Sequence, residues 1–388
     1  MPTYARRVSS FGTTIFTEIN NLARQHQAVN LGQGMPDFDG PREVVEAAAQ
    51  ALLSGHSNQY APGPGVPALK QGIANHAQAF YGMDIDPQNG VLVTPGATEA
   101  VFCSIMGLVD PGQEVIIIEP FFDSYVPGVL MANAKPVYVS LRPPDWTFDP
   151  DELRAAFNEN TRAIILNTPN NPTGRVFTYD ELKLIADLCI EHDVLVISDE
   201  VYEHLVYDEA RHIPIATLPG MFERTVTIGS AGKTFGMTGW KVGWVYGEPE
   251  LVTGVWRSHQ FTSFATNHPA QIAIAHAFTM GSSYYEEMQA LYTHKRNLMM
   301  DALSAAGMTS IMPQGTYFVM ADFSDVFDGD DVAFTKHLIT NIGVACIPPS
   351  AFFSPEHKYL TKDHVRFAFC KSDDTLKAAG ERMAKLRG

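Results

Sequence analysis

The segment from Thr225 to Tyr246 reads TVTIGSAGKTFGMTGWKVGWVY. Its two ends, Thr225–Gly229 and Val242–Tyr246, are short runs rich in β-branched and aromatic residues, which predicts two strands. Between them lies a loop of small residues around Lys233. Because this loop leaves little room for a crossover helix, we expect one strand here to run antiparallel to its neighbours.

Five further apolar runs precede this segment, and amphipathic helices alternate with them. The runs are Val91–Thr94, Val115–Glu119, Pro136–Val139, Ala163–Asn167 and Val194–Ser198. The predicted helices between them include Glu99–Leu108, Glu152–Phe157 and Asp180–His192. Continuous apolar runs with intervening helices are typical of strands covered on both faces. The sequence therefore predicts an α/β fold whose mostly parallel, seven-stranded sheet is flanked by helices.

The flanking regions predict a division into domains. A helix is expected over Pro41–Leu53, and the pattern is again helical from about Pro249 to Ala306. The end of the chain reads as α+β, with strand Tyr317–Phe323, helix Asp331–Ile339, strand Val365–Phe369 and helix Asp373–Leu386. A chain of 388 residues is too long for one core of ordinary size. We expect an N-terminal segment (1–40) packed on a small domain, a large domain (41–284) and that small C-terminal domain (285–388).

Composition argues against several partners and locations. The formal net charge is −16, and an acidic surface repels nucleic acid and anionic membranes. No apolar run approaches the roughly 20 residues that span a bilayer, and the first residues lack the apolar stretch of a secretory signal. The four cysteines (Cys103, Cys189, Cys346 and Cys370) are widely spaced. We therefore expect a reduced, cytoplasmic protein with no nucleic-acid or membrane partner.

Ligands of an open α/β sheet bind beyond the carboxyl ends of its strands, and these ends carry suitable groups. Small residues at Pro95–Ala100 open a helix, whose first N–H groups form an anion site. Aromatic residues follow at Pro120–Tyr125, and two asparagines follow within Thr168–Gly174. Asp199 comes after the next strand, three residues before Tyr202. Each feature alone is also typical of a helix cap, a core aromatic, a turn or a structural pair.

Lys233 is the most specific signal. A lysine amine becomes nucleophilic where burial or a second cation lowers its pKa. Small neighbours let a bulky cofactor approach Lys233, and Ser230 and Lys241 can both reach one phosphate. A surface lysine on a glycine loop would not explain why several strand ends offer complementary groups for one molecule. By contrast, His192 and His204 stand at no metal-ligand spacing from another histidine or cysteine, so we predict no metal site there.

These motifs resemble the class I aminotransferase family of fold-type I pyridoxal-phosphate enzymes. The resemblance spans nearly the whole chain and rests on Gly96–Ala100 (GATEA), Asn167–Gly174 (NTPNNPTG), Ser198–Tyr202 (SDEVY) and Ser230–Phe235 (SAGKTF). Within the family, the chain is similar to kynurenine and glutamine transaminases and to bacterial methionine aminotransferases. That closer match rests on Asn30–Phe38, Glu119–Tyr125, Gly239–Trp244, His259–Gln260 and Asn267–Gln271.

The resemblance implies a set of residues that hold pyridoxal phosphate. Lys233 would carry it as a Schiff base and then move a proton between the substrate and the cofactor. Asp199 would keep the pyridine nitrogen protonated. The remaining residues would bind the ring 3-oxygen (Tyr202, Asn171), cover the two ring faces (Phe122, Val201) and bind the phosphate (Ala97, Thr98, Ser230, Lys241). Many family members have arginine where this chain has Lys241.

The resemblance also implies how the substrate binds. Arg366 would pair with the substrate carboxylate, near Gly34 and Asn171. Tyr60 resembles a tyrosine that reaches the phosphate from the partner subunit, which implies a homodimer. Candidates for an apolar side-chain pocket are Phe16, Tyr60, Tyr125 and Phe264.

No arginine that would pair with a second carboxylate is evident. We therefore predict transfer from a neutral or aromatic L-amino acid (methionine, glutamine, phenylalanine or kynurenine) to a 2-oxo acid. A cysteine-conjugate or cystathionine β-lyase of the same fold is the main alternative. Ring-forming chemistry of the aminocyclopropane-carboxylate synthase type and a non-catalytic regulatory domain are further ones.

Overall fold

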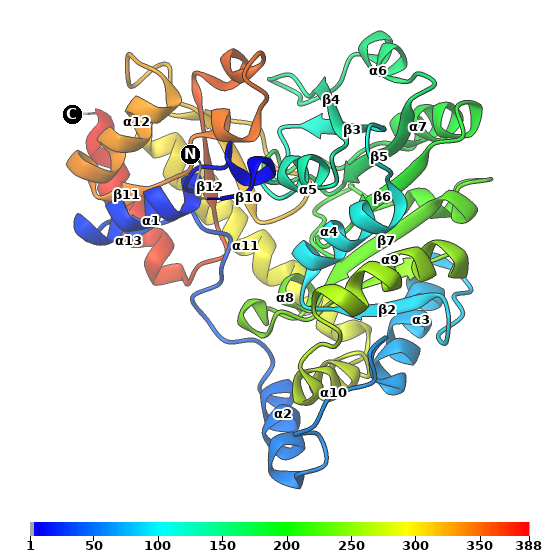
Figure 1. Cartoon of the computed structure of the whole chain (residues 1–388). Coiled ribbons are helices and arrows are strands. Elements are labelled where there is room, and N and C mark those ends of the chain that lie inside the picture. Colours follow the sequence, from blue (N-terminus) through cyan, green and yellow to red (C-terminus); the bar gives the residue numbers. More distant parts are fainter. Residues whose placement is uncertain (1–3, 388) are drawn as a thin grey trace.

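A seven-stranded sheet forms the centre of the computed structural model, which describes residues 4–387 (Figure 1). Its strands, in order across the sheet, are β2 (Val91–Thr94), β8 (Gly243–Gly247), β7 (Thr225–Ser230), β6 (Leu195–Asp199), β5 (Thr161–Asn167), β3 (Glu114–Glu119) and β4 (Lys135–Ser140). β8 runs antiparallel to both of its neighbours, and the other pairs are parallel. The predicted α/β class and the single antiparallel strand are thus confirmed.

Helices cover both faces of this sheet. Alternate strand residues point to opposite faces, and the apolar side chains on each face pack against these helices. Ile117, Ile165 and Ile197 belong to one core, which takes in α3, α4, α9 and α10, whereas Ile116 and Ile164 face a second core under α6 and α7. The helices of this part of the chain are α2 (Arg42–Ser54), α3 (Pro67–Tyr81), α4 (Ala97–Leu108), α5 (Tyr125–Met131), α6 (Pro150–Ala156), α7 (Tyr179–Glu191), α8 (Ala231–Thr234), α9 (Pro249–Thr262) and α10 (His268–Ala277).

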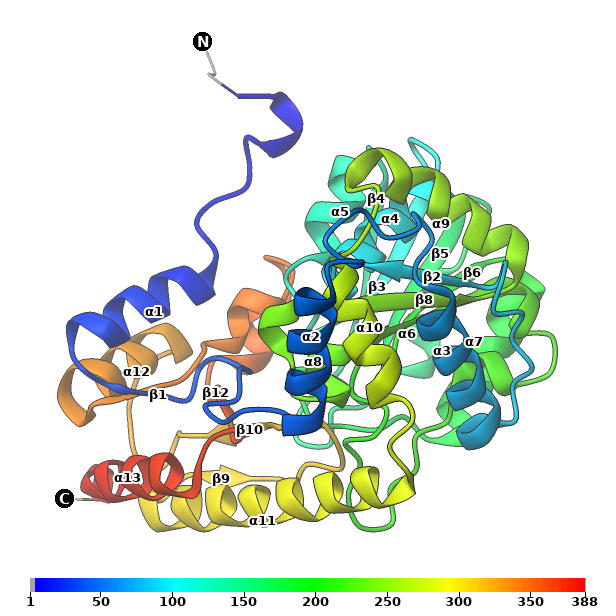
Figure 2. The same ribbon diagram turned by 90° about the horizontal axis from the view of Figure 1, so that it is seen from below.

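The C-terminal part builds a separate antiparallel sheet against a long helix (Figure 2). This sheet has the order β12 (His364–Ala368), β10 (Phe318–Asp322), β9 (Thr309–Ser310). The helices are α11 (Ser282–Ala306), α12 (Asp331–His337) and α13 (Asp373–Met383). A π-helical turn at Leu338–Ile342 follows α12, so the helix predicted to Ile339 changes its hydrogen-bond pattern near its end. The predicted terminal helix likewise tightens into a 3-10 turn at Ala384–Arg387.

The N-terminal segment lies against the C-terminal part. β1 (Val29–Asn30) pairs in parallel with β11 (Val344–Ala345). α1 (Ile15–Gln25) buries Ile19 and Ala23 in a small core of its own with Ile339 and Phe352. The sequence did not predict α1, although Thr14 caps it by accepting from the Thr17 N–H.

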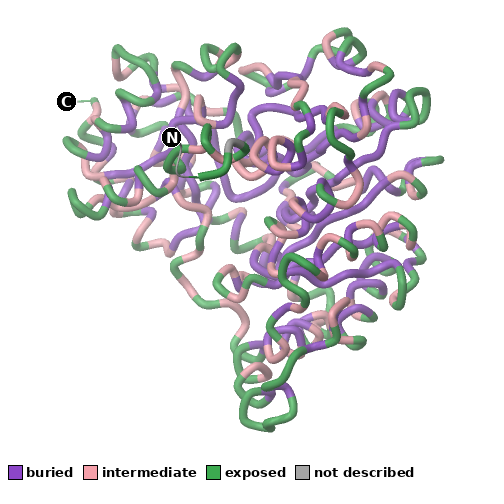
Figure 3. Tube along the Cα trace, in the orientation of Figure 1, coloured by how far each residue is buried: buried purple, intermediate pink, exposed green. Residues whose placement is uncertain are grey.

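Short helical turns and exposed surfaces complete the fold. The remaining 3-10 turns are Arg6–Val8, Ile215–Thr217, Phe222–Arg224, Thr238–Trp240, Pro349–Phe352 and Lys358–Thr361. The strands of the central sheet are buried except for much of the edge strand β4, whereas α2 projects from the body with much of its surface exposed (Figure 3). Among residues 4–387 we find no helix with the length and apolar character needed to cross a membrane.

Candidate active site

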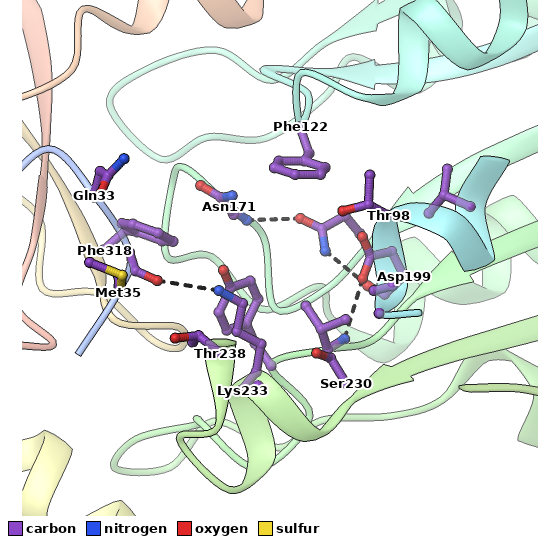
Figure 4. Close-up of a pocket in the computed structure, with 18 of the residues that line it drawn as sticks. Gln33, Met35, Thr98, Phe122, Asn171, Asp199, Ser230, Lys233, Thr238 and Phe318 are labelled. Carbon is purple, nitrogen blue, oxygen red and sulfur yellow. Dashed lines mark hydrogen bonds between the residues drawn. The ribbon is translucent and has the colours of Figure 1, made fainter. Parts of the chain in front are cut away.

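A cavity of about 400 Å³ opens where the carboxyl ends of β5, β6 and β7 meet α4, β10 and β12. This volume lies within the range of small-molecule sites, which runs from about 300 to 1,000 Å³. Of the residues predicted from the sequence, it is lined by Phe16, Gly34, Ala97, Thr98, Phe122, Tyr125, Asn171, Asp199, Val201, Tyr202, Ser230, Lys233, Lys241 and Arg366. Phe122 lies across the cavity from Lys233, with Asp199 on one side and Phe318 on the other (Figure 4). The fold therefore gathers the predicted residues from eight separate regions of the chain, from Phe16 to Arg366, into one site.

Asp199 is a buried carboxylate at the end of β6. The Tyr125 hydroxyl donates to its Oδ2 at 2.6 Å, and the Val201 N–H donates to its Oδ1 at 3.4 Å. The Asn167 amide donates to the Asp199 backbone carbonyl at 2.9 Å. Burial raises the pKa of Asp199 to about 6, against the opposing effect of the Tyr125 hydrogen bond. A cationic partner would therefore stabilise the charged carboxylate here.

Lys233 lies in the short helix α8 directly after β7. Its Nζ donates to the Tyr317 hydroxyl at 2.6 Å and to the Gly34 carbonyl at 3.3 Å. Burial lowers the pKa of Lys233 to about 8, and the nearby cations Arg366 and Lys241 act in the same direction. At pH 8 about half of this amine is therefore neutral and able to act as a nucleophile or base, and at pH 7 about a tenth.

The N-terminus of α4 forms an anion site together with β8. Gly96, at φ +79°, precedes the helix, and a Cβ on it would lie 3.1 Å from Lys241 Nζ. A Cβ on Gly243 would lie 2.6 Å from the Ala97 nitrogen, so only glycine lets β8 approach the start of α4. The free N–H groups of α4, the Lys241 amine and the Thr98 hydroxyl thus converge where a phosphate would sit.

Arg366, on β12, is a buried cation without a counterion. Its Nη1 donates to Asn171 Oδ1 at 2.9 Å and its Nη2 donates to the Gly32 carbonyl at 2.6 Å, while Nε has no partner. No carboxylate of residues 4–387 lies within ion-pair distance of it. The Phe318 ring packs over the guanidinium, 4.1 Å from its centroid. A guanidinium has five N–H donors, so three remain for an anion.

Together these groups fit pyridoxal phosphate with a bound amino acid. The orphaned Nε and the missing counterion of Arg366 call for a carboxylate. The buried carboxyl of Asp199 calls for a cation such as a protonated ring nitrogen, and Phe122 and Val201 offer apolar surfaces to the ring. The anion site at α4 lies in the same cavity as the Lys233 amine.

Two of the predicted aromatic residues lie outside this cavity in the single chain. Phe264 is 49% exposed and meets Tyr60, which is 84% exposed, edge-on at 5.6 Å between centroids. Phe264 follows the end of α9 with φ +68°, and this turn places its ring on the surface. Tyr125 lines the cavity as predicted, and its hydroxyl is bonded to Asp199.

His204 is not isolated, contrary to the sequence expectation. Its Nε2 lies 2.6 Å from Nε2 of His76 on α3, and Glu203 accepts a hydrogen bond from Tyr81 beside them. Burial lowers the pKa of both histidines, so the pair is neutral at pH 7. His76 and His204 are 128 residues apart, and no spacing rule reaches that far.

The sequence analysis also missed residues of the cavity itself. These are Gln33, Met35, Gly96, Val101, Asn167, Gly232, Thr238, Gly239 and Phe318. Tyr317, which contacts Lys233, was missed as well. Tyr317 and Phe318 stand at the start of a predicted strand, where paired aromatics are typical of core, and no local signal marks them as site residues.

Comparison with known proteins places this geometry among transaminases. The profile of the family "Aminotransferase class I and II" matches residues 26–383. Human kynurenine–oxoglutarate transaminase 1 is 42% identical over 413 residues, covering 99% of this chain and 98% of that protein. The structure of N-succinyldiaminopimelate aminotransferase from Mycobacterium tuberculosis has a TM-score of 0.95 and 44% identity, covering 99% of this chain and 100% of that one. A methionine aminotransferase structure from Escherichia coli has a TM-score of 0.94 and 38% identity, with the same coverage.

Proposed function

Because the chain belongs to the family of class I and II aminotransferases, we propose that it moves the amino group of a neutral or aromatic L-amino acid to a 2-oxo acid. The chain is an aminotransferase, and its cofactor is pyridoxal phosphate. When bound, that cofactor supplies an electron sink for a carbanion at the substrate α-carbon. The relatives are named as transaminases, which favours transfer over the β-elimination alternative.

The observation that carries the proposal is that one cavity holds both an amine of lowered pKa, Lys233, and a buried cation without a counterion, Arg366. Arg366 binds and orients the substrate carboxylate through its three free N–H groups. Lys233, with its lowered pKa, takes the proton of the α-carbon: the C–H bond breaks, an N–H bond forms and the electron pair stays on carbon. Asp199 would keep the ring nitrogen of the bound cofactor protonated. Phe122 and Phe318 narrow the cavity and exclude water.

The lining of the cavity supports a neutral or aromatic donor. Phe16 and Phe318 offer apolar surface beside Arg366. Arg366 is the only arginine among the described residues that line the cavity, and it is needed for the α-carboxylate. A second carboxylate, as in aspartate, has no arginine partner there. Methionine, glutamine, phenylalanine and kynurenine fit this lining.

A panel of amino donors tests the substrate class. The purified enzyme, loaded with pyridoxal phosphate, would be assayed with methionine, glutamine, phenylalanine, kynurenine, aspartate and N-succinyldiaminopimelate. We expect kcat/KM for the neutral and aromatic donors to exceed that for aspartate by at least tenfold. Preferred turnover of aspartate or of the succinylated dicarboxylate would contradict the substrate proposal. Pyruvate and ammonia released from cysteine conjugates without a 2-oxo acid would indicate β-elimination instead.

A homodimer that completes the site is part of this proposal. Tyr60 and Phe264 form an exposed aromatic pair, and Leu53 and Phe261 are 81% and 88% exposed. Large exposed apolar side chains on one molecule are typical of a protein interface. Tyr60 would then reach the phosphate of the partner's site.

Complementation tests this arrangement. Lys233→Ala and Tyr60→Ala variants are each expected to be nearly inactive. If Tyr60 acts across the interface, co-expression restores about a quarter of the wild-type activity, because half of the dimers are mixed and each mixed dimer has one intact site. No recovery in mixtures that do form hybrid dimers would place Tyr60 in its own site.

The domain division and the location are also proposals. The β1–β11 pairing supports an N-terminal segment (1–40) that moves with a small domain (285–388), separate from the large domain (41–284). All four cysteines are buried and unpaired, which supports a reducing compartment such as the cytoplasm.

A further inference from the structure

Tyr317 lies where three parts of the chain meet. It directly precedes β10 and is 1% exposed. Its hydroxyl lies 2.6 Å from Lys233 Nζ and donates to the Gly34 carbonyl at 2.7 Å. We propose that Tyr317 is a positioning residue that fixes the direction of the Lys233 lone pair. This inference rests on the proposed function, in which that lone pair takes the substrate proton.

The donor count shows why the direction is fixed. A tyrosine hydroxyl has one proton, and the Gly34 carbonyl and the Tyr202 oxygen both offer an acceptor for it. Toward Lys233 the hydroxyl oxygen is therefore an acceptor. The amine donates one N–H to this oxygen and a second N–H to the Gly34 carbonyl. A neutral amine has only two N–H bonds, so both are used and the lone pair stays free.

The two acceptors also decide where this lone pair points. The Gly34 carbonyl and the Tyr317 hydroxyl both lie on the side of Lys233 that the N-terminal segment and the residues at β10 form. In Figure 4 the amine of Lys233 lies between Met35 and Asp199. The fourth tetrahedral direction therefore faces away from Gly34 and toward the space that the substrate and cofactor share. Rotation about the Cε–Nζ bond would break both hydrogen bonds.

Packing holds the Tyr317 ring in place. Tyr292 stacks on it at 5.9 Å between centroids, and Tyr202 meets it edge-on at 5.3 Å. A Cβ on Gly34 would lie 2.8 Å from the Tyr317 ring. The glycine at this position thus lets the ring approach the carbonyl, in addition to any contact with substrate. The Tyr317 hydroxyl and the Gly34 carbonyl, which together hold the Lys233 amine, are called the clamp below, and it consists of a rigid ring and a backbone oxygen.

The electrostatics make Tyr317 a neutral partner of the amine. Burial raises its pKa well above the usual value of 10, so the phenol keeps its proton over the working pH range. It stabilises an ammonium more than an amine, because hydrogen bonds to charged groups are the stronger ones. Removing the hydroxyl should therefore lower the pKa of Lys233 below its present value of about 8, by roughly half a pH unit to one unit.

Tyr317→Phe tests this role, with Tyr292→Phe as the matched control. The control removes a buried hydroxyl from the neighbouring ring, for which no contact with Lys233 is found. The first measurement uses the apoprotein: the rate of pyridoxal phosphate uptake against pH, followed by absorbance and by borohydride trapping on Lys233. We expect the midpoint of this profile to fall in Tyr317→Phe and to stay at the wild-type pH in Tyr292→Phe.

The second measurement uses the loaded enzyme in single turnovers with methionine and α-deuterated methionine. Loss of the clamp should slow proton transfer by about 10- to 100-fold, since a misdirected base loses alignment, and raise the deuterium isotope effect. KM should change by less than about twofold, because Arg366 still binds the carboxylate.

A wild-type midpoint and a wild-type isotope effect in Tyr317→Phe would overturn the inference. If Tyr317→Phe fails to fold, Gly34→Ala displaces the same ring by its Cβ and should shift the same two readouts. Absence of amino transfer in the wild-type enzyme would refute the proposed function, whereas the uptake profile of the apoprotein would still decide the role of Tyr317.

Discussion

Replacing Arg366 by glutamine should stabilise the substrate-free protein while abolishing efficient turnover. Burial lowers the pKa of Arg366 from 12.5 to about 10. At 1.36 kcal/mol per pH unit, holding this cation in the folded protein costs about 3 kcal/mol relative to the unfolded chain. Glutamine removes the charge and keeps a polar side chain at this position. We therefore expect the free energy of unfolding to rise by about 1 to 3 kcal/mol.

The same change removes the partner of the substrate carboxylate. Two hydrogen bonds between charged groups contribute about 1.5 to 3 kcal/mol each, so kcat/KM for the amino donor should fall by about 10² to 10⁴-fold. Thermal unfolding without ligand and steady-state kinetics measure the two effects on one preparation. Arg366→Lys is the control: it keeps the charge and its cost but loses the fork-shaped geometry.

A carboxylate ligand separates the two effects further. An unreactive substrate analogue should raise the melting temperature of the wild-type protein and leave that of Arg366→Gln unchanged, because only the arginine gains a counterion. The reasoning fails if Arg366→Gln is less stable than wild type by more than about 1 kcal/mol. It fails equally if the analogue still protects the variant.

Three further predictions concern the pockets around the site. Burial raises the pKa of Asp199 to about 6, so retention of pyridoxal phosphate during dialysis should weaken below pH 6. Tyr125→Phe removes the hydroxyl that stabilises the carboxylate and should therefore shift this loss to higher pH. An unchanged pH profile of retention in the variant would contradict this. Burial lowers the pKa of His76 and His204, so below pH 6.5 the unfolded chain binds protons that the folded chain does not. The free energy of unfolding, measured in urea, should therefore fall from pH 7 to pH 5, and it should fall less steeply in His204→Gln than in the wild type. Equal slopes in the two proteins would refute this prediction. In fluorescence titrations of the apoprotein, Lys241→Ala should raise the Kd for pyridoxal phosphate by about 10- to 100-fold, and Lys241→Arg by much less, because arginine keeps the positive charge. An equal rise of the Kd in both variants would show that the charge of Lys241 does not account for its contribution to binding.

The central sheet was predictable because its strands are buried on both faces. Val91–Thr94 matches β2 residue for residue, and the run Thr225–Gly229 lies within β7. Continuous β-branched runs leave little choice of structure. Helix α3 was missed because a glycine- and proline-rich stretch leads into it. Helix α1 was missed although its amphipathic pattern and the Thr14 cap could have predicted it.

The candidate site was predictable where chemistry is local and unpredictable where it depends on distant contacts. Lys233 and Asp199 carry motifs of their own at strand ends. Tyr317 gains its role only because β10 brings it to a carbonyl 283 residues away in the sequence. The His76–His204 pair and the surface position of Phe264 are likewise products of tertiary packing, which a local pattern does not encode.

The loop at Gly32–Gly34 has a consequence for mutational tolerance. Its two glycine carbonyls accept hydrogen bonds from the two key basic side chains, Arg366 and Lys233. A backbone oxygen survives every substitution of its own side chain, so this part of the site cannot be erased by changing a functional group. It can be damaged only by steric displacement, because a Cβ on Gly34 would lie 2.4 Å from the Phe318 ring. A scan of all single substitutions should therefore find intolerance here that follows side-chain volume and ignores side-chain chemistry.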